Sequence, residues 1–200
     1  MKTTRFEAMQ EKSAEGFPKE QGDRIKSTMK KEYDRLIEEN KDIPESFISH
    51  TRNNIFPVAA AFKAFLNEGM DRDEAAKKAN DCFLSLMEDI AVSIRKMMKI
   101  PGMYHLMPSM WKFAMPKLFG ESAGFSYTFY PTGTGDVKFD MTQCPYFNLC
   151  KKLELLEIAP AFCASDDICY GNMHPKLIWE RSSTIARGGS CCDFHLYIKK

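Results

Sequence analysis

Apolar residues recur at spacings of three and four along most of the first 120 residues, which predicts a series of helices. The first regular helix begins at Arg24 and ends before Pro44, with apolar side chains on one face and Lys and Glu on the other. A second spans residues 45–67, and Pro57 is expected to kink it or split it in two. Residues 1–22 are polar, so we expect a flexible N-terminal arm or a short helix there.

The clearest helix follows Asp71. Asp71 and Glu74 form a capping box in the broad sense, and Gly69 is suited to end the preceding helix. The apolar residues of the new helix recur at spacings of three and four: Ala76, Ala79, Phe83, Met87, Ile90, Ile94 and Met97. Pro101 and Gly102 are expected to end it.

A further helical stretch covers residues 103–119 and is expected to be broken at Pro108 and Pro116. Six of the 13 methionines lie from Met97 to Met115. Methionine fills irregular spaces in cores, and it also lines ligand-binding surfaces. We favour irregular core packing here over a ligand-binding or membrane-contacting role.

Beyond Gly120 the period of the pattern changes to two, which is typical of strands. Residues 125–130 and 137–141 alternate in this way. The Gly- and Thr-rich segment 131–135 between them is expected to be a turn, which makes the two runs a hairpin.

Two short helices and a second hairpin complete the prediction. One helix begins at Pro145 and the other spans residues 158–170. A long strand is expected over 176–186, a glycine turn over 187–191 and a last strand over 192–198. The elements predict the α+β class, with an N-terminal helical region followed by an antiparallel sheet of about four strands and two short inserted helices.

A chain of 200 residues can bury a substantial core. We expect residues 1–22 to be a flexible N-terminal arm and residues 23–200 to form a single α+β domain. Its helical part would cover 23–120, and its sheet part 121–200.

The composition limits the kinds of partner that the chain is expected to bind. The chain has 28 Lys and Arg against 27 Asp and Glu, so it offers no basic face for nucleic acid. It has no apolar run near the roughly 20 residues of a membrane span, and its charged N-terminus lacks a signal-peptide pattern. We therefore expect a cytoplasmic protein that binds a small molecule, with seven cysteines that are not paired in disulfides.

Six of the seven cysteines lie between Cys144 and Cys192, so this quarter is the candidate for chemistry. Cys144 precedes a proline at a predicted helix start. There the helix dipole would lower its pKa, although a small residue that fits the turn is the alternative. Cys163 shares a helical face with Asp166 and Asp167, which could orient a substrate amine or a general base, or raise the pKa of the thiol. Cys192 is expected to point inward from the last strand.

Two arginines near the last turn, Arg181 and Arg187, could clamp a carboxylate through paired hydrogen bonds. The alternative for a strand arginine is a surface ion pair. Zinc is a rival explanation of this region, and its possible ligands are Cys163, Asp166, Cys191, Cys192 and His174 or His195. Because no CxxC, HxxxH or HExxH spacing is present, we expect no metal and no other cofactor.

The C-terminal motifs resemble a known family. The motifs are Cys144-Pro145, Phe162-Cys163 with Asp166, Arg181 with Thr184, and the run Gly188-Gly189-Ser190-Cys191-Cys192-Asp193-Phe194. A looser likeness lies upstream at Asn54-Ile55-Phe56-Pro57, Ala60 and residues 66–76. Together they resemble the L-2-amino-thiazoline-4-carboxylic acid hydrolase family over most of residues 45–200, and the closing Cys-Asp-Phe is the most recognisable part.

That resemblance implies a hydrolase that opens a carbon–nitrogen bond, other than a peptide bond, in a small cyclic amidine bearing a carboxylate, such as 2-amino-thiazoline-4-carboxylate. Laid on the matched positions, this chemistry suggests Cys163, Cys192, Cys144, Asp166 and Asp193 for catalysis and Arg181 and Thr184 for substrate binding. An alternative comes from residues 179–194, which are faintly similar to the small-molecule-binding domains named after vinyl reductase. In that case the chain would be a non-catalytic binding or sensor module, with cysteines that bind a metal or shape a pocket.

Overall fold

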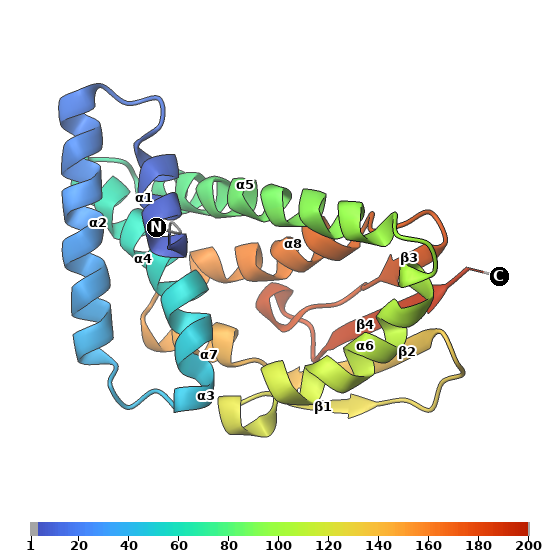
Figure 1. Ribbon diagram of the computed structural model, residues 1–200. Helices are drawn as coiled ribbons and strands as arrows, with labels where there is room; N and C mark the ends of the chain where they lie inside the picture. Colours follow the sequence, from blue (N-terminus) through green and yellow to red (C-terminus); the bar gives the residue numbers. More distant parts are fainter. Residues whose placement is uncertain (1–3, 200) are drawn as a thin grey trace. The chain divides into compact units, whose positions relative to one another are not determined.

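The computed structural model describes residues 4–199 and confirms the α+β class (Figure 1). Helices occupy the chain through Leu118, and a four-stranded antiparallel sheet follows, with helices inserted between its second and third strands. The chain divides into two compact units. Unit 1 comprises Met1–Leu86 and Cys150–Phe162, and unit 2 comprises Met87–Leu149 and Cys163–Lys200.

Unit 1 is helical. Its helices include α1 (Arg5–Ala14), α2 (Lys19–Glu39), α3 (Glu45–His50), α4 (Phe56–Asn67) and the first part of α5 (Arg72–Met98). Because α1 and α2 both pack against α4, this helix is buried along most of its length, including Phe62 and Phe65. The segment expected to be an arm or a short helix contains α1, which begins with a capping box between Thr4 and Glu7 and buries Met9.

Pro57 lies just after an irregular turn of the helix predicted over residues 45–67. A π-helical turn, η1 (Thr51–Ile55), lies between α3 and α4, and Pro57 is the second residue of α4. The residues at these boundaries keep helical dihedral angles, so the helical path continues through the π-helical turn. The predicted boundary near Gly69 is confirmed. Gly69 adopts a φ of +89°, and Asp71 Oδ1 accepts the Glu74 N–H at 2.8 Å to start α5.

The helix α6 (Met103–Leu118) corrects one expectation, because it continues through Pro108 and Pro116 instead of breaking there. Each proline removes one backbone hydrogen bond. Pro116 lies in the last turn of α6, so few helical residues follow it. Pro108 and Met115 are buried within unit 2. Packing against the sheet therefore outweighs the local cost of both prolines.

The sheet belongs to unit 2 and has the strand order β1-β2-β4-β3. Its strands are β1 (Ser126–Phe129), β2 (Asp136–Gln143), β3 (Leu177–Glu180) and β4 (Cys192–Ile198). In the β2–β4 register Phe139 pairs with Phe194 and Met141 with Cys192, so these side chains share the buried face. Helix α6 lies over that face, where the Trp111 and Phe139 ring centroids are 6.3 Å apart. The predicted first hairpin and last strand are confirmed.

Strand β3 is shorter than the strand predicted over residues 176–186, because it ends at Glu180. Beyond it, the N–H groups of Ser182 and Ser183 donate to Asp193 Oδ1 at 3.0 and 2.6 Å instead of continuing the ladder with β4. The segment then forms a 3-10 turn, η4 (Ile185–Arg187). This departure from the sheet forms one wall of the pocket described below.

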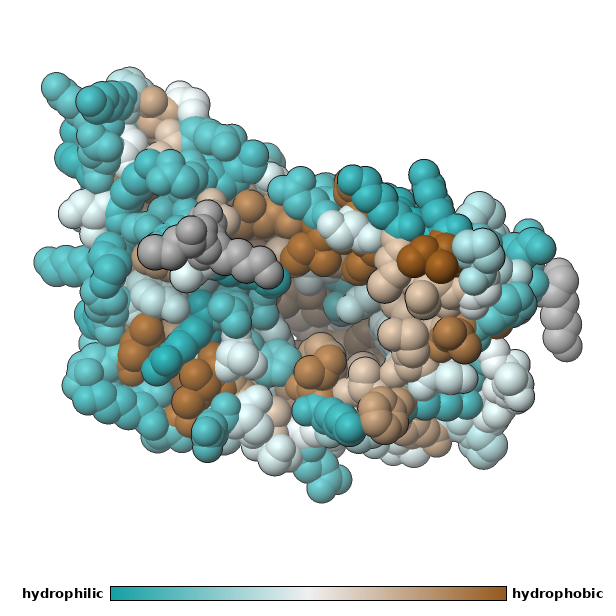
Figure 2. Space-filling model, in the orientation of Figure 1, coloured by the Kyte–Doolittle hydropathy of each residue, from teal (hydrophilic) through white to brown (hydrophobic). Residues whose placement is uncertain are grey.

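The methionine-rich stretch is only partly core. Its buried members are Met98, Met107 and Met115, which fits the predicted irregular packing. The outer face of α6 instead exposes Leu106, Met110 and Phe113, and Figure 2 shows apolar side chains along this helix. Within residues 4–199, no helix has both the length and the apolar character needed to cross a membrane.

Candidate functional site

Arg181 is a buried cation just beyond the end of β3, and only 2% of its side-chain surface is accessible. Its Nη1 donates to Asp166 Oδ2 at 2.9 Å. Its Nη2 donates to Asp167 Oδ2 at 2.8 Å and to the Cys163 carbonyl oxygen at 2.7 Å. The Arg181 guanidinium is therefore bound on both of its terminal nitrogens by groups of the protein itself.

Helix α8 (Ala159–Tyr170) supplies both aspartates, and β3 fixes one of them. Trp179 Nε1 donates to Asp167 Oδ1 at 3.1 Å, while the Arg181 guanidinium carbon lies 5.7 Å from the centroid of the Trp179 ring. Asp167 thus bridges the two side chains. The remaining aspartate, Asp166, has Arg181 as its ion-pair partner.

Asp166 has a perturbed carboxyl group. Burial raises its pKa to about 6, although Arg181 acts in the opposite direction. Protein surrounds the carboxyl group closely enough to raise the pKa, yet 35% of the side-chain surface still faces solvent. A carboxylate with a pKa near neutrality accepts a proton from water more readily than an ordinary aspartate. Burial alone would lower the pKa of Arg181, but Asp166 and Asp167 outweigh that effect and raise it, so the guanidinium stays charged.

The three predicted thiols, Cys144, Cys163 and Cys192, lie close enough to influence one another's pKa. Cys163 and Cys192 both act on the titration of Cys144, and Cys163 acts on that of Cys192. Burial raises the pKa of Cys144 to about 12 and that of Cys192 to about 11. Burial also raises the pKa of Cys163, against the opposing effects of Arg181 and Arg187. All three side chains are therefore protonated thiols near neutral pH, and not the thiolates that attack electrophiles.

The lowered pKa expected for Cys144 is wrong. Cys144 does precede α7 (Pro145–Lys152), and the N–H groups of Phe147 and Tyr146 favour a thiolate there, as predicted from the helix start. Burial outweighs this effect, because a buried thiolate would lose its hydration. The inward orientation predicted for Cys192 is confirmed by its exposure of 3%.

Asp193 holds the backbone beyond β3. Its carboxylate accepts the N–H groups of Ser182 and Ser183, and it also accepts the Ser182 hydroxyl at 2.5 Å. Burial would raise the pKa of Asp193, but these hydrogen bonds outweigh burial and lower it. The structure therefore uses Asp193 as a fixed anion that shapes the segment leading to Thr184.

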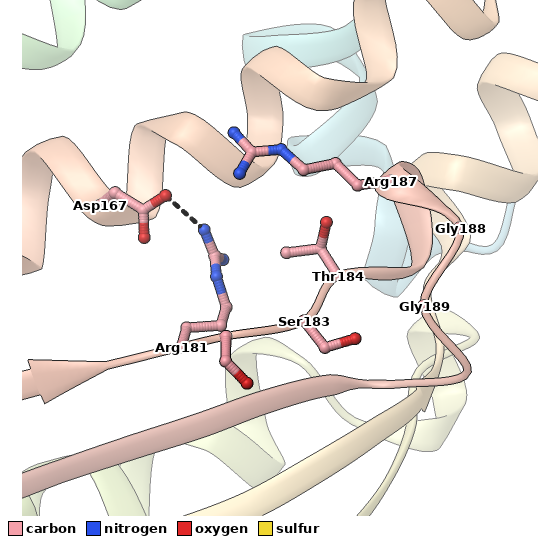
Figure 3. A pocket seen from close by; sticks show the side chains of 8 residues that line it. Asp167, Arg181, Ser183, Thr184, Arg187, Gly188 and Gly189 are labelled. Atoms are coloured by element: carbon pink, nitrogen blue, oxygen red, sulfur yellow. Dashed lines mark hydrogen bonds and ion pairs between the residues drawn. The ribbon is translucent and has the colours of Figure 1, made fainter.

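A pocket of about 240 Å³ lies beside Arg181 in unit 2 (Figure 3). Asp167 and Arg181 line one side, and residues 182–184 and 187–189 line the rest. Thr184 is only 4% exposed, and within residues 4–199 its hydroxyl has no hydrogen-bond partner of normal geometry. The pocket thus combines charged groups with a buried, unpaired hydroxyl in its wall.

Position 189 has no room for a side chain, which explains the glycine there. A Cβ at this position would lie 2.1 Å from Ser183 Oγ and 3.0 Å from the Thr184 carbonyl oxygen. Gly188 is the matched control, because its φ of +88° disfavours a side chain but its surroundings are open. We expect Gly189→Ala to lower the free energy of unfolding by about 1–3 kcal/mol and Gly188→Ala by about 1 kcal/mol, as measured by urea unfolding. A Gly189→Ala protein as stable as the wild type would contradict this account of the turn.

The two histidines considered as zinc ligands have other partners. Among residues 4–199, no three His, Cys, Asp or Glu side chains are arranged to hold a metal ion. His195 Nε2 instead lies 3.0 Å from Asp136 Oδ1, and His174 Nδ1 accepts the N–H of Lys176.

Several pocket residues were not predicted. The sequence pattern predicts a strand at Ser182 and Ser183 and only a turn at Gly189. The available signal was the polar run Ser-Ser-Thr directly after Arg181, which suits a segment leaving a sheet better than a strand within one. Arg187 was predicted as part of a carboxylate clamp, and the structure places it at this pocket.

The pocket, the ion pairs and the three thiols all lie within residues 48–196, and this region matches a protein family described as L-2-amino-thiazoline-4-carboxylic acid hydrolase. The match covers most of the chain, from within α3 into β4, and leaves out α1 and α2. No curated protein and no solved structure matches the chain. From the extent of the family match, the chain belongs to the L-2-amino-thiazoline-4-carboxylic acid hydrolase family.

Proposed function

We propose that the protein hydrolyses a carbon–nitrogen bond in a small cyclic amidine that bears a carboxylate, such as 2-amino-thiazoline-4-carboxylate. Family membership supports a hydrolase in general terms. The observation that carries the proposal is Asp166, whose carboxyl group has a pKa raised to about 6 by burial and yet remains accessible to water. Perturbed carboxyl groups beside a pocket are typical of catalytic sites.

In the proposed reaction Asp166 acts as a general base. It accepts a proton from a water molecule while the water oxygen bonds to the amidine carbon, and it returns that proton to the ring nitrogen. The ring carbon–nitrogen bond then breaks, its electron pair stays on the nitrogen, and the hydroxyl proton follows. One water is consumed, and the carbon keeps its oxygen as the carbonyl of S-carbamoyl-cysteine.

Arg181 is a positioning residue in this proposal. It holds the Asp166 carboxyl group at 2.9 Å, and its second nitrogen is bound to Asp167 and to the α8 backbone. These contacts fix the position and orientation of the Asp166 carboxylate, and Arg181 itself need not contact the substrate. Such preorganisation lowers the cost of reaching the transition state.

The thiols do not attack the substrate in this proposal, because burial keeps them protonated. We expect Cys163→Ser and Cys192→Ser to retain activity within about tenfold of the wild type, since serine preserves the size and the donor. Steady-state kinetics of the two variants would measure this. A loss of about a thousandfold or more in either variant, with the fold intact, would indicate covalent catalysis by that thiol.

The same protonated thiols are the observation that favours the second candidate function, a binding or sensor module without turnover. Incubation of pure protein with 2-amino-thiazoline-4-carboxylate separates the two. The hydrolase proposal expects carbamoyl-cysteine to accumulate in catalytic amounts. Binding without product across pH 5–9 would favour the sensor instead.

The product also identifies the bond that breaks. Cleavage of the ring carbon–nitrogen bond leaves the carbamoyl group on sulfur and releases a primary amine. Cleavage of the carbon–sulfur bond would leave that group on nitrogen and release a thiol. Amine and thiol reagents applied to the same reaction mixture distinguish these outcomes, and the proposal expects the amine.

A further inference from the structure

We propose that Arg187 and Thr184 form a carboxylate-binding subsite that anchors the substrate, and that Arg181 does not have this role. The inference rests on the proposed function for the identity of the natural ligand. The subsite itself is argued from groups that the pocket contains and the rest of the protein leaves unused.

Arg181 is excluded as the anchor by its own contacts. Both terminal nitrogens of its guanidinium are bound, one to Asp166 and the other to Asp167 and the Cys163 carbonyl. A substrate carboxylate could bind these two nitrogens only by displacing an aspartate or the Cys163 carbonyl. Each displaced group would lose a charge-assisted hydrogen bond to the buried guanidinium.

The guanidinium of Arg187, in contrast to that of Arg181, has donors that the described part of the protein does not use. It lines the pocket, its side chain is exposed, and its guanidinium forms no hydrogen bond or ion pair with any residue in the 4–199 range. Its charge nevertheless reaches the interior of the site, because it acts to lower the pKa of Cys163. Figure 3 shows the Arg187 side chain extending from η4 past Thr184 toward Arg181. A free planar guanidinium in this position suits paired hydrogen bonds to a carboxylate.

Thr184 is the second, independent indication of a ligand. Its side chain is almost completely buried in the pocket wall, and in the described part of the chain its hydroxyl lacks a partner of normal geometry. The hydroxyl lies close enough to Cys163 to stabilise a thiolate, but that cysteine is a protonated thiol at neutral pH. Leaving a buried hydroxyl unsatisfied costs about 1–3 kcal/mol, and a carboxylate oxygen would remove that cost by accepting its proton.

The turn at Gly188 and Gly189 leaves space in the pocket beside Arg187. Gly188 and Gly189 line the pocket next to Arg187, and neither places a side chain in front of it. The volume of about 240 Å³ is below the range typical of drug-sized ligands and suits a five-membered ring with a carboxylate. The subsite therefore selects small carboxylates over the corresponding neutral rings.

Equilibrium binding tests the subsite separately from catalysis. The probe is L-thiazolidine-4-carboxylate, which has no amidine carbon to hydrolyse, and its neutral match is thiazolidine. Isothermal titration calorimetry at pH 7.5 should show wild-type protein binding the carboxylate at least tenfold more tightly than thiazolidine. Arg187→Gln should weaken carboxylate binding by about 10- to 100-fold, the range for a hydrogen bond to a charged group. Thr184→Val should weaken it by a smaller factor.

Lys176→Gln is the control, because it removes one exposed positive charge from unit 2 outside the pocket and should leave binding unchanged. Equal binding by wild type and Arg187→Gln would overturn the subsite. So would a wild-type protein that binds neither probe or does not distinguish them. If binding depends on Arg187 while 2-amino-thiazoline-4-carboxylate is not turned over, the subsite stands and the proposed hydrolase function fails.

Discussion

Asp166→Asn is expected to lower kcat/KM for 2-amino-thiazoline-4-carboxylate by about 10²–10⁴-fold, the contribution typical of a general base. Asparagine keeps the shape of the side chain but cannot take the proton from water. The wild-type profile should also fall as pH drops below about 6, because the base is active only when deprotonated and its pKa is raised to about 6. The variant should lack this limb. Activity measured from pH 4.5 to 8.5 for both proteins tests the prediction.

Asp167→Asn is the matched control for this experiment. It removes the same charge from the next residue of α8 and weakens one contact of Arg181, but it leaves Asp166 in place. We expect a loss below about tenfold, with the acidic limb retained. If the two variants lose equal activity, the decisive property is the charge around Arg181, and Asp166 has no special role as a base.

Arg181→Met is expected to have the largest effect on stability, lowering the free energy of unfolding by about 2–4 kcal/mol, because it removes three charge-assisted hydrogen bonds of a buried guanidinium, while the partly exposed carboxylates that remain can regain water. The wild-type side chain is only 2% accessible, and it ties the end of β3 to α8. Methionine preserves much of the volume, so the loss reports the charge and its hydrogen bonds. Urea unfolding followed by circular dichroism provides the measurement.

Arg35→Met supplies the comparison for stability. Arg35 also contacts two carboxylates, Glu32 and Glu39, but all three lie on α2 and 42% of the arginine side chain is exposed. Solvent-exposed pairs of this kind contribute little, so its loss should be a small fraction of the loss at Arg181. Comparable losses at the two positions would show that burial of Arg181 does not govern its contribution.

The fold was predictable where one local pattern determined the structure. The apolar spacing of α5 and the alternation in β2 and β4 each identify a buried face without knowledge of its partner. The prediction failed where long-range contacts decide the outcome. Helix α6 continues through its prolines because the sheet supports it, and β3 ends early because Asp193 takes the N–H groups that would have continued the ladder.

The candidate site was likewise predictable from local sequence only in part. Sequence spacing placed Asp166 and Asp167 near Cys163, but only the folded structure shows that both carboxylates bind Arg181. The helix start at Cys144 favours a thiolate locally, but burial, which depends on the whole unit, raises the pKa instead. Burial therefore determines both the protonated state of the thiols and the raised pKa of Asp166.

The most direct test of the account is product formation by pure wild-type protein and Asp166→Asn, each shown to be folded, with 2-amino-thiazoline-4-carboxylate at pH 7.5. If Asp166 is the general base, we expect many turnovers to S-carbamoyl-cysteine by the wild type and a rate at least about 100-fold lower for the variant. No product from the wild type, or equal rates from the two proteins, would contradict it.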